Sequence, residues 1–130
     1  MFEVSVRTHF SSAHRLVGYP GACANPHGHN WEVDVFVRGT KLNELGILVD
    51  FRELRQALRD AVAALDHADL NTLPEFAAQN PTSENLARHL FRALGARLNS
   101  PARRVARVRV CETPGSAADY WEDDEHGQRL

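Results

Sequence analysis

The sequence has few cysteines, no long hydrophobic run and no excess of basic residues. Two cysteines among 130 residues are too few for the disulfide framework that supports small secreted proteins. The apolar runs fall far short of the ~18 residues that a membrane span needs, and the start, MFEVSVRTHF, lacks the basic and then apolar pattern of a signal peptide. We therefore expect a soluble cytoplasmic protein with free thiols and no membrane partner.

Charge and length narrow the class further. Fifteen Lys and Arg residues oppose seventeen Asp and Glu residues, and the arginines are scattered rather than gathered in a block, so no nucleic-acid partner is indicated. An apolar content of 43% suffices for one core in one domain. So short a chain has little room for a deep private cleft, which favours a site shared between subunits. Seven histidines are the unusual feature.

The periodicity predicts an α+β fold. Apolar and polar residues alternate from Phe2 onward and again from Trp31 to Arg38, which indicates two half-buried strands in a large antiparallel ribbon. The first strand is expected to continue through SSAHRL. RVARVRVCE (104–112) predicts a third strand, and ADYWE (118–122) predicts a short fourth strand.

Two helices are expected between the second and third strands. Apolar residues recur at threes and fours after Asp50, which with Glu53 resembles a capping box, and this helix should end near Asp66. The second helix should begin after Thr82 as N-cap, with leucines at 86, 90, 94 and 98 on one face. The order ββααββ predicts a four-stranded antiparallel sheet with two helices on one face. We expect one domain, 1–122, and a polar tail, 123–130.

Histidines gather where the first two strands should meet. His27 and His29 are two apart on an extended chain, so both side chains project to one face, and His14 lies on the neighbouring strand. Three imidazoles with an open fourth position are typical of a catalytic zinc site. By itself, an H-G-H pair is a weak signal for metal and more often consists of exposed histidines or of core histidines that bind the backbone.

Three further positions carry candidate chemistry. Cys23 precedes the histidine pair, where its thiolate can act as a base or nucleophile, although an inert loop cysteine is the alternative. Asp66 beside His67 can orient and polarise an imidazole for proton transfer, or can form a solvated helix end. Glu112 shares the parity of Val108 and Val110, so it either faces the apolar side and binds a hydrogen-bond donor or turns outward at the strand end.

Six motifs occur in an order that resembles the 6-pyruvoyl-tetrahydropterin synthase family along residues 2–122: FSSAH, CANPHGH, LVDF, LDHADLN, PTSENLA and ETPGSAADY. The spacing C-x-x-x-H-G-H is similar to the bacterial 6-carboxy-5,6,7,8-tetrahydropterin synthase branch of queuosine biosynthesis. In the pyruvoyl-forming branch the cysteine lies farther from H-G-H. The resemblance implies the tunnelling fold (T-fold) and a homohexamer, a dimer of trimers with active sites between subunits.

The resemblance also assigns residues. It implies Zn²⁺ held by three metal ligands, a thiol and a proton relay as catalytic residues, and a carboxylate with two helpers as substrate-binding residues. The implied metal ligands are His14, His27 and His29. The implied catalytic residues are Cys23, Asp66 and His67, and the implied substrate-binding residues are Glu112, Thr82 and Ser83. For Thr82 and Ser83, helix capping explains the residues equally well.

The implied activity is that of a zinc-dependent lyase. Its substrate would be the pterin triphosphate 7,8-dihydroneopterin triphosphate, and its products 6-carboxytetrahydropterin, acetaldehyde and triphosphate. Two alternatives are a 6-pyruvoyl-tetrahydropterin synthase and a non-catalytic module that binds zinc and a pterin. A thiol, an imidazole and a carboxylate together favour catalysis, because binding alone needs no proton relay. The many arginines do not indicate which of them bind the triphosphate.

Overall fold

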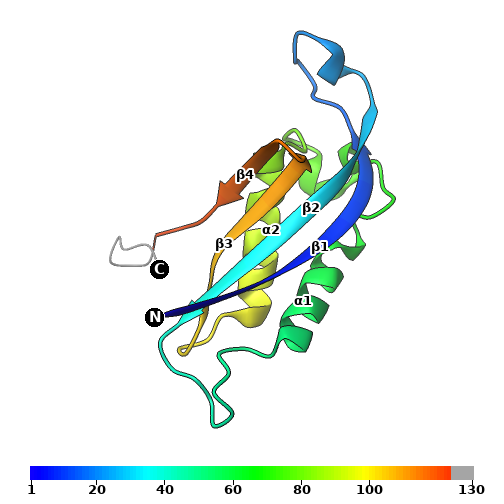
Figure 1. Cartoon of the computed structure of the whole chain (residues 1–130). Helices are drawn as coiled ribbons and strands as arrows, with labels where there is room; N and C mark the ends of the chain where they lie inside the picture. Colours follow the sequence, from blue (N-terminus) through cyan, green and yellow to red (C-terminus); the bar gives the residue numbers. More distant parts are fainter. Residues whose placement is uncertain (124–130) are drawn as a thin grey trace.

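The structure, a computed structural model, describes residues 1–123 (Figure 1). Four strands form one antiparallel sheet in the order β1-β2-β3-β4. These are β1 (Phe2–His14), β2 (His27–Gly39), β3 (Arg104–Thr113) and β4 (Ser116–Tyr120). Two helices, α1 (Phe51–Ala63) and α2 (Ser83–Leu98), lie between β2 and β3 in the chain and cover one face of the sheet (Figure 1). The predicted ββααββ order is confirmed.

The alternation in the strands sends one side of each strand into the core. On β2, Trp31, Val33, Val35 and Val37 are fully buried. Val33 and Val35 lie across from Val110 and Val108 of β3. The buried leucines of α2, predicted from their spacing, complete the core at positions 86, 90, 94 and 98. The fold therefore has two layers around one core, with the helices on the apolar face of the sheet.

Three predicted boundaries are wrong. β1 ends at His14, the last residue of the β1–β2 pairing. α1 ends at Ala63: the Leu65 amide donates to the Val62 carbonyl three residues before it, which tightens the last turn, and the His67 amide donates to Ser11 of β1 instead of to the helix. β4 starts earlier than predicted, because a turn pairs Ser116 directly with Thr113.

The helix starts agree with the prediction. The Asp50 side chain accepts a hydrogen bond from the Arg52 amide, and Thr82 Oγ1 accepts from the Asn85 amide. Each cap satisfies a backbone donor that the first turn of a helix leaves free. Glu53 does not complete a capping box, since its carboxylate binds Arg103 at 2.9 Å. No helix among the described residues is long and apolar enough to cross a membrane.

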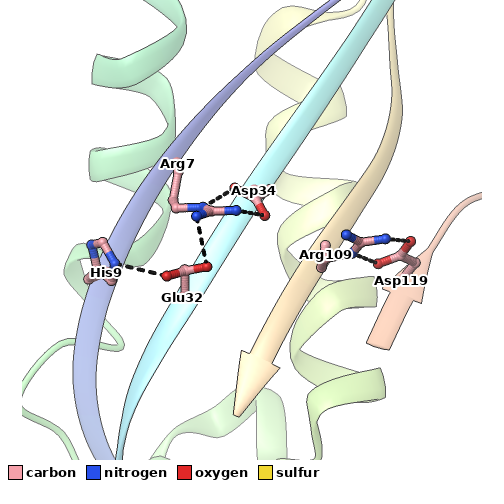
Figure 2. A network of polar contacts seen from close by, with 6 residues as sticks. All are labelled: Arg7, His9, Glu32, Asp34, Arg109 and Asp119. Atoms are coloured by element: carbon pink, nitrogen blue, oxygen red, sulfur yellow. Dashed lines mark hydrogen bonds and ion pairs between the residues drawn. The ribbon is translucent and has the colours of Figure 1, made fainter. Parts of the chain in front are cut away.

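Ion pairs link the strands on the face opposite the helices (Figure 2). Arg7 of β1 binds Asp34 of β2 at 2.7 and 3.2 Å. Arg109 of β3 binds Asp119 of β4 at 2.7 and 3.1 Å, and Arg107 adds a third contact at 2.8 Å. Both acids lie directly across from an arginine in the strand register. These pairs fix the register of β1 and β4, which carry the two edges of the sheet.

Replacing Asp119 with asparagine is expected to lower the free energy of unfolding by about 1 kcal/mol at pH 7, the size of a partly screened ion pair. Hydrogen bonds from Arg109 and then Arg107 hold the pKa of the Asp119 carboxyl below its ordinary value. The stabilisation is therefore complete above the unfolded-state pKa of about 3.9 and is lost as the pH falls through the lower folded-state value.

Urea unfolding of both proteins from about pH 3 to pH 8, at one protein concentration, measures this difference. The matched control is Asp60→Asn on the exposed side of α1, where the carboxylate binds Arg97 at 2.7 Å but is 52% exposed. A smaller effect is expected there because solvent screens the pair. A difference between Asp119→Asn and wild type that grows as the pH falls would contradict the prediction.

Candidate metal centre

Three histidines converge where the β1–β2 ribbon opens into the loop of residues 15–26 (Figure 1). His14 lies directly across from His27, and His29 lies across from Ser12. The three imidazole centroids are 4.5 to 5.0 Å apart. The buried Trp31 ring supports the group from below, 5.0 Å from His14 and 5.2 Å from His29. Strand pairing thus brings together three residues from two separate motifs.

Backbone carbonyls fix the orientation of two of these rings. Nδ1 of His14 lies 2.8 Å from the Pro81 carbonyl oxygen, and Nδ1 of His27 lies 2.8 Å from the Asn25 carbonyl oxygen. A carbonyl only accepts, so each Nδ1 must carry the proton and each Nε2 has a free lone pair. Histidines that bind metals are commonly oriented in this way.

The opposite nitrogens have no such partner. Among residues 1–123, Nε2 of His14 and Nε2 of His29 are buried and form no hydrogen bond. Burial lowers the pKa of His29 below its ordinary value, outweighing the nearby Glu112 carboxylate, and so favours the neutral imidazole that binds metals. The backbone therefore binds only one nitrogen of His14, and Nε2 of His14 and of His29 lies near the Glu112 carboxylate instead. The residues present therefore fit a metal ion.

Glu112 joins the histidines. Its Oε1 atom lies 3.1 Å from Nε2 of both His14 and His29, and the donor atoms of all four residues lie within 4.8 Å of one another. Two donors bound to one zinc ion at about 2.0–2.2 Å in a tetrahedron are about 3.3 Å apart. The spacing thus suits a fourth, oxygen ligand. Strand parity gave this direction as one of two alternatives, and the sequence did not predict the proximity of Glu112 to the imidazoles.

Cys23 lies in a 3-10 turn, Ala22–Ala24, within the loop that joins β1 to β2. Its side chain is partly exposed and its thiol is free. The donor group formed by the described residues does not include it. Cys111, the other free thiol, lies on β3, where burial raises its pKa and favours the protonated form. Both thiols are partly exposed, so the position of Cys23 beside the histidines, and not its exposure, makes it the candidate for a reactive thiol, and its role stays a prediction.

Asp66 and His67 form a hydrogen-bonded pair, with Oδ1 of Asp66 2.9 Å from Nδ1 of His67. They lie beyond the end of α1 and bind β1. The Ser11 amide donates to the Asp66 carboxylate at 3.0 Å, and the His67 amide donates to the Ser11 carbonyl at 2.6 Å. The Ser11 amide, and after it His67, lowers the pKa of Asp66. The pair is thus held on the sheet edge rather than at a helix terminus.

His67 has an uncommon backbone conformation and an open side chain. Its φ of 56° lies in the left-handed region that residues with a Cβ rarely adopt. The side chain is 83% exposed. Asp66 binds Nδ1, so Nε2 is the ring nitrogen that this pair leaves available. Such local strain is often found at functional sites.

Thr82 and Ser83 lie at the start of α2. The Thr82 hydroxyl caps the helix by accepting the Asn85 amide at 3.1 Å. The preceding residue, Pro81, supplies the carbonyl that orients His14. Thr82 therefore supports the histidine group through the backbone, and contact of Thr82 or Ser83 with a substrate stays a prediction.

Known proteins share both the sequence and the fold of this chain. Residues 3–123 match the protein family described as 6-pyruvoyl tetrahydropterin synthase. A putative 6-carboxy-5,6,7,8-tetrahydropterin synthase from Archaeoglobus fulgidus is 36% identical over 121 residues, 92% of each chain. A human 6-pyruvoyl tetrahydrobiopterin synthase is 32% identical over 132 residues, covering 91% of this chain and 90% of that protein.

A solved structure of 6-pyruvoyl tetrahydropterin synthase from Caenorhabditis elegans superimposes with a TM-score of 0.84. It is 27% identical, and the match covers 94% of this chain and 96% of that chain. The agreement extends over the sheet and both helices and confirms the predicted tunnelling fold.

Proposed function

The chain belongs to the 6-pyruvoyl tetrahydropterin synthase family, and from this we propose that it is a zinc-dependent carbon–carbon and carbon–oxygen lyase. It converts 7,8-dihydroneopterin triphosphate and one water into 6-carboxy-5,6,7,8-tetrahydropterin, acetaldehyde and triphosphate. Oxidation of the side-chain carbon to a carboxyl group is balanced by reduction of the pterin ring and loss of triphosphate. The observation that carries the proposal is the convergence of three histidines beside the Cys23 loop, two of them oriented by backbone carbonyls.

The choice of product depends on one spacing. Relatives named for the carboxy and pyruvoyl activities are 36% and 32% identical to this chain, so identity does not decide between them. Three residues separate Cys23 from His27, and this short gap favours the 6-carboxy product and a place in queuosine biosynthesis. Formation of the 6-pyruvoyl product is the second candidate, because pyruvoyl-forming relatives match almost the whole chain.

Zinc is the metal that this donor set favours. Imidazole nitrogens and one carboxylate oxygen are ordinary zinc ligands, and a tetrahedral arrangement suits it. When bound, zinc supplies a Lewis acid that makes protons next to coordinated oxygens more acidic. His14 and His27 hold their Nε2 atoms toward that position through their backbone hydrogen bonds. Trp31 closes the site on the core side.

The remaining residues handle protons and the pterin ring. Cys23, as a thiolate, removes and returns protons on the substrate side chain. His67, oriented by Asp66, exchanges protons from a different side of the substrate. Glu112 accepts the pterin amino and N–H edge, which requires its carboxylate to leave the histidines when substrate arrives. Thr82 is a weaker candidate helper, since its hydroxyl is engaged in capping, and Ser83 lies beside it.

We also propose that the site is shared between subunits of a homohexamer. The His67 side chain is 83% exposed, and β1 and β4 are the two edge strands of the sheet. Residues 66–69 cover β1 only at Ser11 and Ala13, so among residues 1–123 the rest of β1 pairs with no further strand and can pair with another subunit. The pairing of Asp66 and His67 with β1 places the relay at one of these edges. We expect a cytoplasmic enzyme that acts on a small molecule, without a nucleic-acid or membrane partner.

Product analysis tests the proposed reaction. The purified protein, loaded with zinc, is incubated without oxygen with 7,8-dihydroneopterin triphosphate, and the products are identified by mass spectrometry. We expect 6-carboxytetrahydropterin and acetaldehyde in equal amounts. The 6-pyruvoyl product alone would identify the second candidate. Binding of the pterin without any product would indicate the non-catalytic module.

A further inference from the structure

Two asparagine side chains hold the chain just after the metal ligand His14. Asn71 accepts a hydrogen bond from the Arg15 amide at 2.8 Å and donates one to the Arg15 carbonyl at 3.1 Å. Asn80 does the same for Val17, at 2.9 and 3.1 Å. We call these two side chains the asparagine clamps. They continue the hydrogen bonding along residues 15–17 after the sheet pairing has ended.

The residue between the clamps holds Cys23. Amides and carbonyls of successive residues in an extended chain point to opposite sides. Arg15 and Val17 therefore face the clamps, while Leu16 faces the other way and donates its amide to the Cys23 carbonyl at 2.8 Å. Residues 15–17 thus have the clamps on one edge and the Cys23 turn on the other.

Each clamp is anchored in ordered structure. Asn71 lies in a 3-10 turn, Leu70–Thr72, whose first residue is fully buried. The Asn80 carbonyl accepts hydrogen bonds from the Asn85 side chain of α2 at 2.8 Å and from the Thr82 amide at 2.9 Å. The clamps therefore link the Cys23 turn to the segment before α2, where the Pro81 carbonyl orients His14.

We propose that Asn71 and Asn80 are positioning residues that hold Cys23 at a fixed distance from the metal ligands. The inference rests on the proposed function, in which Cys23 transfers protons. Only a primary amide offers one acceptor and one donor side by side on a short side chain. An aspartate would keep the acceptor but lose the donor to the carbonyl, and alanine would lose both. Lysine and arginine lack the acceptor.

The test measures Cys23 directly. Wild type, Asn71→Ala and Asn80→Ala are treated with iodoacetamide in the native state, and modification of each cysteine is followed by peptide mass spectrometry. We expect Cys23 to react about tenfold faster in both variants, because two lost hydrogen bonds of ordinary net strength shift a local opening by about that factor. The rate at Cys111, on the sheet, should not change.

Asn43→Ala is the matched control. Its side chain also accepts two backbone hydrogen bonds in a loop, from Leu45 and Ile47, but at the opposite end of the β1–β2 ribbon (Figure 1). Cys23 should react in this variant as in wild type. If Asn71→Ala does not fold, Asn71→Asp and Asn80→Ala carry the test, and the aspartate variant should give a smaller change.

Steady-state kinetics separate positioning from general damage. In an active enzyme, kcat should fall about tenfold in each clamp variant, while zinc content and KM stay near wild type. The inference would be overturned if Cys23 reacted with iodoacetamide as in wild type. It would also be overturned if Cys23 reacted faster with iodoacetamide while kcat stayed unchanged. If wild type shows no turnover but the clamp variants still expose Cys23, the positioning stands and the proposed function fails instead.

Discussion

Replacing Cys23 with alanine is expected to reduce turnover of 7,8-dihydroneopterin triphosphate by about a hundredfold or more, the usual contribution of a positioned acid or base. Zinc content and pterin binding should remain near wild type. The reason is that three histidines already supply the protein ligands of an open zinc site, and the donor group among the described residues does not include Cys23. The turn Ala22–Ala24 is also held through the Cys23 carbonyl, which alanine retains.

Single-turnover assays, zinc analysis and equilibrium binding of the substrate to Cys23→Ala measure the three quantities. Cys111→Ala is the matched control, because it removes the other free thiol and should leave turnover unchanged. Loss of zinc from Cys23→Ala would make the cysteine a ligand. Retained turnover would assign proton transfer to another group.

The Cys23→Ala variant also tests whether the site is shared between subunits. If Cys23 and His67 in one site come from different subunits, Cys23→Ala and His67→Ala are each inactive alone. Refolding equal amounts together should restore about a quarter of the wild-type activity, because a quarter of randomly formed interfaces combine two intact halves. No recovery in verified mixed oligomers would place the relay within one chain.

Much of the fold could be predicted, because the burial pattern and the chain order agree. The alternation in β2 marks Val33 and Val35 as core, and both are fully buried. The N-caps Asp50 and Thr82 were identifiable because capping is a local interaction. The end of α1 was not, since the His67 amide leaves the helix to bind Ser11 of β1, and this contact joins residues far apart in the sequence.

The candidate site was only partly predictable for the same reason. Pairing of two strands across a loop brings His14 beside His27, and this follows from the predicted ribbon. The proximity of Glu112 to the imidazoles depends on how β3 ends. Asn71 is the last residue of the LDHADLN motif and Asn80 directly precedes the PTSENLA motif, and only the folded chain shows that each side chain binds the amide and carbonyl of one residue.

Replacing His27 with alanine is expected to have the largest effect on the metal centre. Loss of a residue that only hydrogen-bonds to a metal ligand weakens metal binding by about 10- to 100-fold. Loss of a ligand itself should therefore weaken zinc binding by more than that. Turnover should be lost with the metal. The fold should remain, since His27 is the first residue of β2 and is not a core side chain.

Two further variants make this test specific. His9→Ala removes an exposed histidine on the opposite face, where it contacts only the Glu32 carboxylate among the ion pairs of the sheet (Figure 2), and should keep full zinc. Glu112→Gln distinguishes the roles of the carboxylate. A large loss of zinc affinity would identify a ligand, whereas normal zinc with a raised KM would identify the acceptor of the pterin.

Zinc content and turnover, measured on the same samples of wild type and His27→Ala, test the central claim most directly. The proposed centre predicts about one zinc per chain in wild type, as expected of a single site with three imidazole ligands. His27→Ala should contain little zinc and show no turnover. Adding zinc at concentrations that load the wild-type protein should restore neither the zinc content nor the turnover. Full zinc occupancy in His27→Ala, or turnover by zinc-free wild type, would contradict the claim.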